Sequence, residues 1–443
     1  MTFCVSVNQQ TPLEAQLINK KTAIESWLRK KWLTHNPPFY GSVDLRNAAY
    51  KMAPIDMNLF PGGFNHLNSN FLTAAVISAQ EAICRIRPEV HSILLIPENH
   101  TRNLFYLENI HALRQILLKA GFEVRIASLN PLIKQNTIIH TVGGHQLTLE
   151  PLIRKGDRIV LEDGFTPCII LLNNDLSAGI PEILLNLKQP ITPPVFAGWT
   201  VRTKSKHFEI FDTVIQELCS EIQFDPWLLN AYFDVCYCLS FKHPQSHQEL
   251  SDKVSDLLKR IQLKYRAYGI REKPFVIMKA NSGTYGMGVM TVRAPEDVLN
   301  LNRKNRNKMA TVKEGLAVHD VILQEGVYSY ENIDGAVAEP VVYMMDRFVI
   351  GGFYRSHKGR SNDENLNASG MQFIQLGEDI SNVLSSNDWF DPHHHFKQWE
   401  APALPSHNEP LSHRSDRFYL YGLLARLSLL AASIEIEQSP SAP

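Results

Sequence analysis

The chain has 443 residues, of which 44% are hydrophobic and 20% charged, and its formal net charge is −1. This composition is typical of a globular protein with two or three domains, and it gives no field that would favour nucleic acid or an anionic membrane surface as a partner. With no C-x-x-C pair, no apolar run long enough to span a bilayer and no signal-peptide pattern at the start, we expect a cytoplasmic protein with reduced thiols and neither a membrane nor a nucleic-acid partner.

The first part of the chain alternates predicted helices and strands. Residues from about Pro12 to Trp32 have the spacing of one amphipathic helix, and residues 39–60 predict two strands with a short connection. Residues 71–86 form a second predicted helix, which has to end before Pro88.

The segment that follows has the pattern of a βαβ unit. Residues 92–97 and 122–128 are short apolar strands, and a glycine ends the helix that is predicted between them over 104–120. Further strands are predicted within 159–179. We therefore expect one α/β domain over 81–198, which ends in a proline-rich connector.

Helices and then strands are predicted after residue 199. The helices cover 207–222 and 251–269, and strands dominate from Lys273 onward. The last helix, over 417–433, is apolar on most of its surface. We expect it either in the core or in a subunit interface, which leaves a homo-oligomer open.

A glycine-rich loop between two predicted strands is the most informative segment. Lys279 ends the first strand, and the loop from Asn281 to Gly288 has the spacing G-x-x-G-x-G. The Rossmann motif and the P-loop both place a helix after the glycines, so neither fits. A hairpin of this kind can close its backbone N–H groups over phosphates while the lysine neutralises a phosphate oxygen. The alternative is a surface hairpin with a solvated lysine.

The first predicted strand pair carries an unusual Asp-x-Asn pattern. Asp56 and Asn58 are two residues apart, so they share one face of a strand, and a Pro-Gly-Gly turn follows. If the connection turns near Tyr50, Asp44 on the preceding strand stands roughly opposite Asp56. The plain alternative is that Asp56 and Asn58 cap a turn and that Asp44 is a surface acid.

Together these segments resemble the ATP-grasp enzymes. The lysine and glycine hairpin are followed by VILQEGV (321–327), which resembles the strand that contacts adenosine in that family. DRFVIGGFYR (346–355) resembles the strand that ends on an arginine near the transferred phosphate, which is Arg355 here. ENLNASGM (364–371) resembles the asparagine-glycine loop that follows.

The magnesium-binding strand pair that normally ends an ATP-grasp enzyme is missing after the last helix. Such a pair carries an Asp and then Glu-x-Asn, and the strands with Asp44, Asp56 and Asn58 resemble it, moved to the front of the chain. Eukaryotic glutathione synthetases carry such a circular permutation. The resemblance implies an α/β (α+β), circularly permuted ATP-grasp fold with an additional α/β, pre-ATP-grasp-like substrate domain. The implied domains are residues 1–80 with 199–443 for the ATP-grasp part and residues 81–198 for the added part.

With IPENHTRN (96–103), NNDLS (173–177) and GWTVRTKSKHF (198–208), the chain resembles the proteobacterial glutamate–cysteine ligase family of ATP-grasp type. The resemblance implies that ATP and Mg²⁺ are used to join glutamate to cysteine through an acyl phosphate. The product would be γ-glutamylcysteine, in the first step of glutathione biosynthesis. Two alternatives stay open: another ATP-grasp peptide or amide ligase, such as a glutathione-synthetase-like enzyme, and a non-catalytic nucleotide-binding regulator.

The resemblance also implies roles for single residues. The expected metal ligands are Asp44, Asp56 and Asn58, and the expected catalytic residues are Lys279 and Arg355. The expected nucleotide contacts are Lys206, preferred over Lys204, and Lys279, Ser282, Gly283, Gly286, Gly288, Gln324 and Glu325. The expected substrate contacts are Asn65, Asn68, Glu98, His100, Arg102, Asn174 and Asn367. For the last part of IPENHTRN the alternative is a polar turn in which Thr101 or Asn103 caps the next helix.

Overall fold

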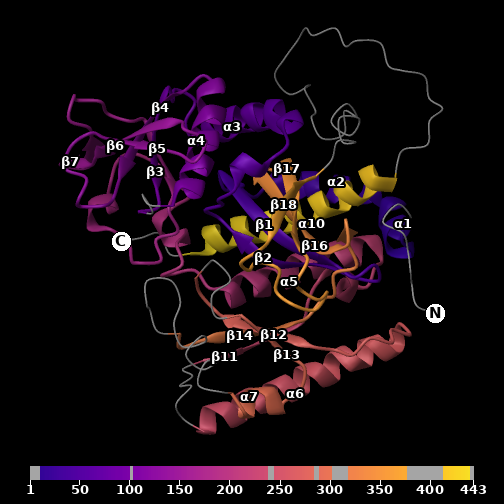
Figure 1. Cartoon of the computed structure of the whole chain (residues 1–443). Helices are drawn as coiled ribbons and strands as arrows, with labels where there is room; N and C mark the ends of the chain where they lie inside the picture. Colours follow the sequence, from indigo (N-terminus) through magenta and orange to yellow (C-terminus); the bar gives the residue numbers. More distant parts are fainter. Residues whose placement is uncertain are drawn as a thin grey trace, which may run out of the picture.

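The computed structural model describes residues 10–99, 103–237, 244–283, 289–301, 318–376 and 413–439. These residues form three main sheets, a two-stranded ribbon and a central group of helices (Figure 1). The predicted mixed α/β class is confirmed.

The central sheet joins the two ends of the chain. Its strands are antiparallel in the order β18-β17-β16-β1-β2, and β15 also pairs with β16. Because β1 pairs with β16, a strand pair from the N-terminal part completes a sheet built from residues after 331, as the predicted permutation requires. The strands are β1 (Tyr40–Asn47), β2 (Met52–Asn58), β15 (Asn332–Ile333), β16 (Ala336–Met345), β17 (Phe348–His357) and β18 (Gln372–Gln375).

A second sheet forms the α/β unit at the left of Figure 1, in the order β10-β9-β3-β4-β6-β5. All neighbours in it are parallel except β5 and β6, so the predicted βαβ unit is confirmed. The elements are α3 (Leu72–Ile86), β3 (Ser92–Pro97), α4 (Leu104–Lys119), β4 (Glu123–Ser128), β5 (Thr137–His140), β6 (Gln146–Pro151), β9 (Ile169–Asn173) and β10 (Ile191–Thr192).

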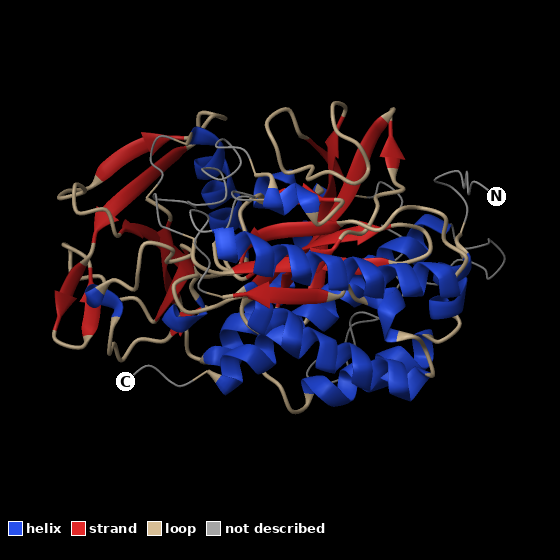
Figure 2. Ribbon diagram, turned by 90° about the horizontal axis from the view of Figure 1, so that it is seen from below, coloured by secondary structure: helices blue, strands red, loops and turns tan. Residues whose placement is uncertain are grey.

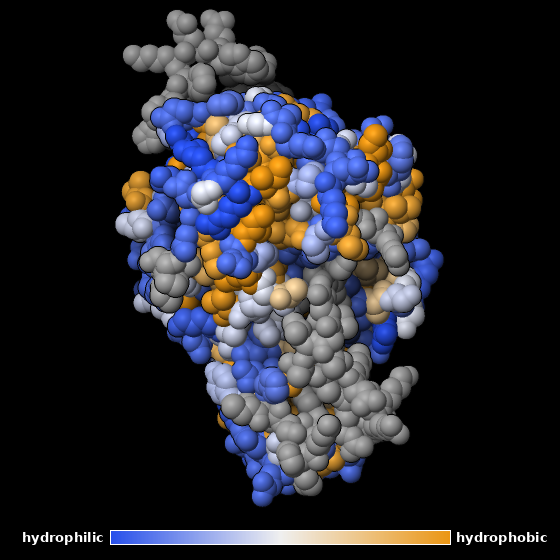
Figure 3. Space-filling model, turned by 90° about the vertical axis from the view of Figure 1, so that its left-hand side faces the viewer, coloured by the Kyte–Doolittle hydropathy of each residue, from blue (hydrophilic) through white to orange (hydrophobic). Residues whose placement is uncertain are grey.

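The strand expected near residue 159 does not join this sheet. β8 (Arg158–Val160) pairs with β7 (Ile153–Lys155) in the separate ribbon, because Gly156 in the left-handed region (φ 62°) folds the chain back at once. The face of the protein at the left of Figure 1 shows a band of hydrophobic atoms bordered by hydrophilic ones (Figure 3).

The third sheet carries the predicted glycine hairpin. Its order is β11-β14-β12-β13, and β12 and β13 are antiparallel, which confirms that a strand and not a helix follows the loop. Helix α6 runs beside this sheet at the bottom of Figure 1. The elements are β11 (Phe233–Cys236), α6 (Pro244–Ala267), β12 (Val276–Ala280), β13 (Met290–Val292), α7 (Glu296–Leu299) and β14 (Val321–Glu325).

The first predicted helix is two helices, α1 (Pro12–Ile18) and α2 (Lys21–Trp32). Asn19 is the C-cap of α1, so the amphipathic pattern continues across a break that periodicity alone does not reveal. Two short 3-10 helices, η1 (Phe64–His66) and η5 (Pro226–Leu229), also lie near the site described below.

The last helix, α10 (His413–Gln438), packs beside α5 (Lys204–Ile222) and against the central sheet. Figure 2 shows helices lying along one side of the strands. By length and composition alone its segment Arg417–Gln438 could cross a membrane, but that segment is mostly buried inside the protein, as core helices are. Buried ion pairs tie α10 to the N-terminal helices: Arg417 bonds Glu14 at 2.6 Å and Arg426 bonds Glu25 at 2.6 Å.

Candidate active site

A cavity of about 640 Å³ lies where the three sheets meet. Side chains from the central sheet, from β12 and β14, and from the carboxyl ends of β3 and β9 line it. Many expected site residues are in its wall, and they are Asp44, Asp56, Asn58, Asn65, Glu98, Lys279, Gln324, Glu325, Arg355 and Asn367.

The predicted register of the first strand pair is confirmed. Asp44 and Asp56 are directly opposite each other, and Asn58 pairs with Ser42. The connection turns where expected: the N–H of Ala48 donates to the carbonyl of Lys51 at 2.8 Å, next to Ala49 at a φ of 67°. The two carboxylates and the amide therefore come together on one sheet face. Among the described residues no three His, Cys, Asp or Glu side chains group as a metal site.

Asn58 has a local structural role as well. Its Oδ1 accepts the N–H of Phe60 at 2.9 Å, which is the turn-capping bond that the plain alternative required. Asp56 does not cap in this way, because its Oδ1 accepts Lys204 Nζ at 2.6 Å. Burial raises the pKa of Asp56, but Lys204 and then Lys279 outweigh it and lower that pKa to about 2. Asp56 is therefore ionised at neutral pH.

Arg355 links Asp44 to a buried acid that the sequence reasoning missed. Arg355 Nη1 bonds Asp44 Oδ2 at 2.9 Å and Glu339 Oε1 at 2.8 Å, and Glu339 in turn bonds Arg46 Nε at 2.6 Å. Glu339 stands directly opposite Arg355 on the neighbouring strand. Burial raises the pKa of Asp44, and the Arg355 charge opposes that shift. A lone acid inside the apolar run AVAEPVV was the signal that could have revealed Glu339.

Lys279 projects from β12 into the cavity. Its Nζ donates to Gln324 Oε1 at 2.8 Å and to the carbonyl of Ile55. Burial lowers its pKa to about 8, and the charge of Asp56 opposes that shift. Lys279 thus lies between the third sheet and the strand that carries Asp56.

Glu325, one of the expected nucleotide contacts, bonds three groups of the protein. Its carboxylate bonds Lys51 Nζ at 2.7 Å, Trp227 Nε1 at 3.1 Å and the N–H of Tyr232 at 2.9 Å. Side chains alternate along a strand, so the Glu325 side chain projects from the opposite face of the sheet to that of Gln324, which bonds Lys279. Three donors already occupy this carboxylate.

The two lysines considered for the nucleotide site, Lys206 and Lys204, have different surroundings. Lys206 is exposed and its Nζ lies 3.6 Å from Glu209, whereas Lys204 is buried against Asp56. Thr203 caps α5, and two residues in a helix are about 200° apart around its axis, so the two lysines point to opposite sides. Lys204 Nζ also lies 4.4 Å above the ring of Trp199.

Other expected residues are not in the cavity wall or lie outside the described ranges. Asn68 Oδ1 accepts the N–H of Asn70, and Asn174 bonds the carbonyl of Pro97 and the N–H of Leu176. Ser282 and Gly283 (φ 93°) follow β12 but are not in the cavity wall. His100, Arg102, Gly286 and Gly288 lie outside the described residues, and so does the alternative cap Thr101, whereas Asn103 does cap α4.

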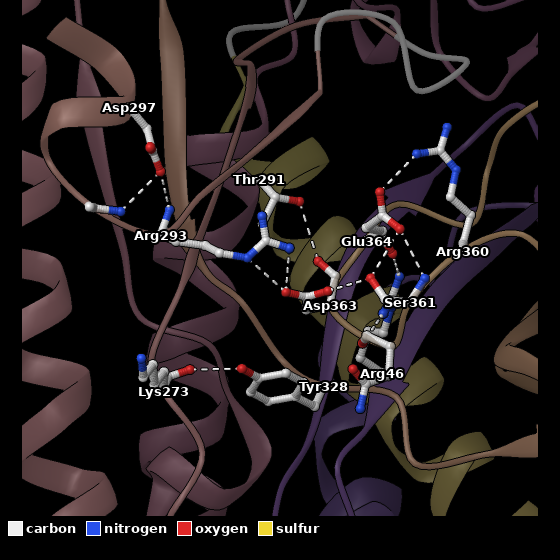
Figure 4. Close-up of polar contacts among 12 residues, drawn as sticks. Arg46, Lys273, Thr291, Arg293, Asp297, Tyr328, Arg360, Ser361, Asp363 and Glu364 are labelled. Atoms are coloured by element: carbon white, nitrogen blue, oxygen red, sulfur yellow. Dashed lines mark hydrogen bonds and ion pairs between the residues drawn. The ribbon is translucent and has the colours of Figure 1, made fainter. Parts of the chain in front are cut away.

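The loop of residues 358–371 joins β17 to β18 in the central sheet and also contacts the end of β13 in the third sheet (Figure 4). After β13, Arg293 bonds Asp363 Oδ2 through Nη2 at 2.5 Å and Nε at 3.0 Å, and Thr291 Oγ1 donates to the Asp363 carbonyl at 3.3 Å. On the other side, Arg46 donates to the carbonyl of Glu364 at 2.6 Å. These contacts join β13 to the loop that Arg46 on β1 also holds.

Comparisons with known proteins agree with this geometry. A family model for glutamate-cysteine ligase (GshA) matches residues 14–436. A solved structure from Methylobacillus flagellatus KT, assigned as a gamma-glutamylcysteine synthetase, is 48% identical over 98% of both chains, with a TM-score of 0.84. A glutathione synthetase-like effector from Globodera pallida is 10% identical over 82% of this chain and 79% of its own, and its TM-score of 0.34 is too low to support an argument. The comparison with curated proteins gives no match.

Proposed function

The chain belongs to the glutamate-cysteine ligase family, and we propose that it uses ATP and Mg²⁺ to join the γ-carboxylate of glutamate to the amino group of cysteine. The observation that carries this proposal is the meeting of Asp44, Asp56 and Asn58 with Lys279 and Arg355 in one cavity, where Lys204 also bonds Asp56. We place the reaction in the cytoplasm, where ATP and reduced thiols are both available.

The residues present fit a magnesium ion. Mg²⁺ prefers carboxylate and amide oxygens, and Asp44, Asp56 and Asn58 offer these from facing strands. Asp56, with its low pKa, is ionised and ready to bind a cation. When bound, the ion would neutralise phosphate charge. Lys204 and Arg355 now bond two of these carboxylates, so both cations stand within side-chain reach of phosphates held at the same place.

The proposed reaction needs positioning and charge neutralisation but no nucleophilic side chain. A glutamate γ-carboxylate oxygen attacks the γ-phosphorus of ATP, ADP leaves, and an acyl phosphate forms. Lys279 and Arg355 neutralise the phosphate oxygens. The amine of the second substrate then attacks the acyl carbon and phosphate leaves.

The parts of the chain would divide the work. We propose that residues 1–80 and 199–443 form the ATP-grasp part and that 81–198 supply a substrate-binding part. Glu98 and Asp175, at the ends of β3 and β9, bring acidic side chains to the cavity from that side, where an ammonium group would be attracted. The glycine hairpin would exclude water, which otherwise hydrolyses the acyl phosphate.

The test is phosphate release by the full chain with ATP, Mg²⁺ and a panel of amino-acid pairs. We expect the pair glutamate and cysteine to give the highest rate, with γ-glutamylcysteine as the product. A maximal rate with γ-glutamylcysteine and glycine would instead identify a glutathione-synthetase-like ligase. Nucleotide binding without phosphate release from any pair would identify a non-catalytic regulator.

A further inference from the structure

His66 has no role in the proposed reaction, yet it lies in the cavity wall. It ends η1, directly after the turn that follows the Asp56 strand. The imidazole stacks on Phe373 with a centroid distance of 4.0 Å and an angle of 19°, and it meets Phe353 edge-on at 5.7 Å. Two aromatic rings therefore fix the orientation of a titratable group.

These aromatic rings place His66 beside the phosphate-binding arginine. Phe373 on β18 stands directly opposite Arg355 on β17, and Phe353 is two residues before Arg355 on the same strand. Directly opposite residues, and residues two apart, share one sheet face. The imidazole thus lies over the face that presents Arg355 and, across β16, Asp44.

The second half of the proposed reaction needs a proton acceptor. The α-amino group of an amino acid is mostly an ammonium ion at neutral pH, and an ammonium nitrogen has no electron pair for attack. The carboxylates on this sheet face are already engaged: Asp44 and Glu339 bond Arg355, and Asp56 bonds Lys204. By contrast, the half-buried His66 imidazole has one hydrogen-bond partner in the described structure, the Asn65 side chain at 3.4 Å.

We propose that His66 takes the proton from the attacking amine of the second amino acid. The ammonium loses one proton to an imidazole nitrogen, the freed electron pair forms the C–N bond, and the C–O bond to phosphate breaks with its electron pair on the leaving phosphate. The nitrogen then loses a second proton to that phosphate, which leaves a neutral amide. The imidazolium then releases the proton to water. This assignment rests on the proposed ligase function.

Burial supports the role, because it lowers the pKa of His66 below the ordinary value of about 6.5 and keeps the ring neutral at physiological pH. Titratable and charged groups that share the cavity wall with His66 include Asp44, Glu98, Tyr106, Asp175, Glu339, Tyr343, Arg355 and Asp363. Helix α4, which packs on η1, also carries Glu108, His111, Arg114 and Lys119. Burial is the cause of the shift despite these neighbours.

The test compares two acceptors on the same enzyme, cysteine and hydroxylamine. Hydroxylamine is unprotonated at neutral pH and traps an acyl phosphate without a base. His66→Phe keeps the aromatic stack and removes both nitrogens. We expect it to lower the rate with cysteine by about 100-fold and to change the rate with hydroxylamine by no more than about threefold. The low-pH limb of kcat/KM for cysteine should also disappear.

Because both acceptors are assayed on one preparation, a partly misfolded variant leaves the ratio of rates intact. His66→Gln should give the same ratio, and the exposed His140→Gln on β5 serves as the matched control. A wild-type rate with cysteine in His66→Phe, or an equal loss with both acceptors, would overturn the assignment. Wild-type protein that forms no hydroxamate and no peptide would instead refute the ligase function itself.

Discussion

Asp44 and Asp56 stand directly opposite each other on the antiparallel strands β1 and β2, in the wall of one cavity. Opposite residues in such strands have Cα atoms only about 5 Å apart, so two carboxylates there repel each other unless cations lie between them. Lys204 and Arg355 are those cations in the described structure. This relationship makes a binding site for Mg²⁺ and phosphate the most economical account of the strand pair.

Asp56→Asn should raise the Mg²⁺ concentration needed for half-maximal rate by an order of magnitude or more, because it removes a ligand charge. Its thermal stability should change little, since the amide can still accept Lys204. Rates are measured across a magnesium titration, and unfolding is followed by circular dichroism.

Asn58→Ala tests whether Asn58 both binds the metal ion and caps the turn. It should raise the Mg²⁺ requirement and also cost about 1 kcal/mol of unfolding free energy, because the bond to the Phe60 N–H is lost. A stability loss with unchanged magnesium dependence would show that Asn58 only caps the turn.

Lys204→Ala and Lys206→Ala form a matched pair on one helix. Lys204→Ala should lower turnover by about 100-fold, since it removes a cation beside Asp56 from a buried polar site. Lys206→Ala should stay within about twofold of wild type, because its side chain is exposed. Equal effects of the two substitutions would contradict the placement of the lysines.

Lys51→Met should lower the free energy of unfolding but leave the rate of phosphate transfer by the folded protein unchanged. The Lys51–Glu325 pair is fully buried, and removing one partner of such a pair leaves an uncompensated charge at a cost of about 3–5 kcal/mol. Urea unfolding measures the loss, and Glu325→Gln in the same background should recover part of it. A variant as stable as wild type would show that the pair contributes nothing.

The raised pKa of the buried Glu331 carboxyl should make the stability of the protein depend on pH. Burial raises its pKa to about 7, although the Tyr421 hydroxyl donates to Oε1. Between about pH 4.5 and 7 the folded state keeps a proton that the unfolded state has released. This contribution to stability is therefore complete below pH 4.5 and is lost as pH rises to about 7, on the order of 3 kcal/mol in total.

The Glu331 prediction is checked as a difference between proteins. Unfolding free energies of wild type and Glu331→Gln are compared from pH 4.5 to 8, because other groups shift both curves alike. The gap between the curves should change steadily up to about pH 7 and then stay constant. A gap that does not depend on pH would contradict the assignment.

Sequence reasoning predicted those features that follow from local periodicity. The period of two in a strand puts Asp56 and Asn58 on one face, and the short connection near Tyr50 then fixes Asp44 opposite Asp56. A strand after the glycine loop followed from its β-branched residues. These features depend only on a few neighbouring residues.

The features that sequence reasoning did not predict depend on contacts between distant segments. Which of Lys204 and Lys206 points inward depends on how α5 packs, and the direction of Glu325 is set by the distant Lys51 and Trp227. Glu339 bonds arginines from two other strands, and its position in an apolar run indicates burial but not these partners. The aromatic stack around His66 joins three segments that are far apart in the chain.

Oxygen transfer from glutamate to phosphate tests the central claim most directly. Glutamate labelled with heavy oxygen in its γ-carboxylate is incubated with the full chain, ATP, Mg²⁺ and cysteine, and the released phosphate is analysed by mass spectrometry. An acyl phosphate formed in this cavity predicts one labelled oxygen atom in each phosphate, in step with γ-glutamylcysteine formation. Phosphate released without label, while the peptide forms, would contradict the account.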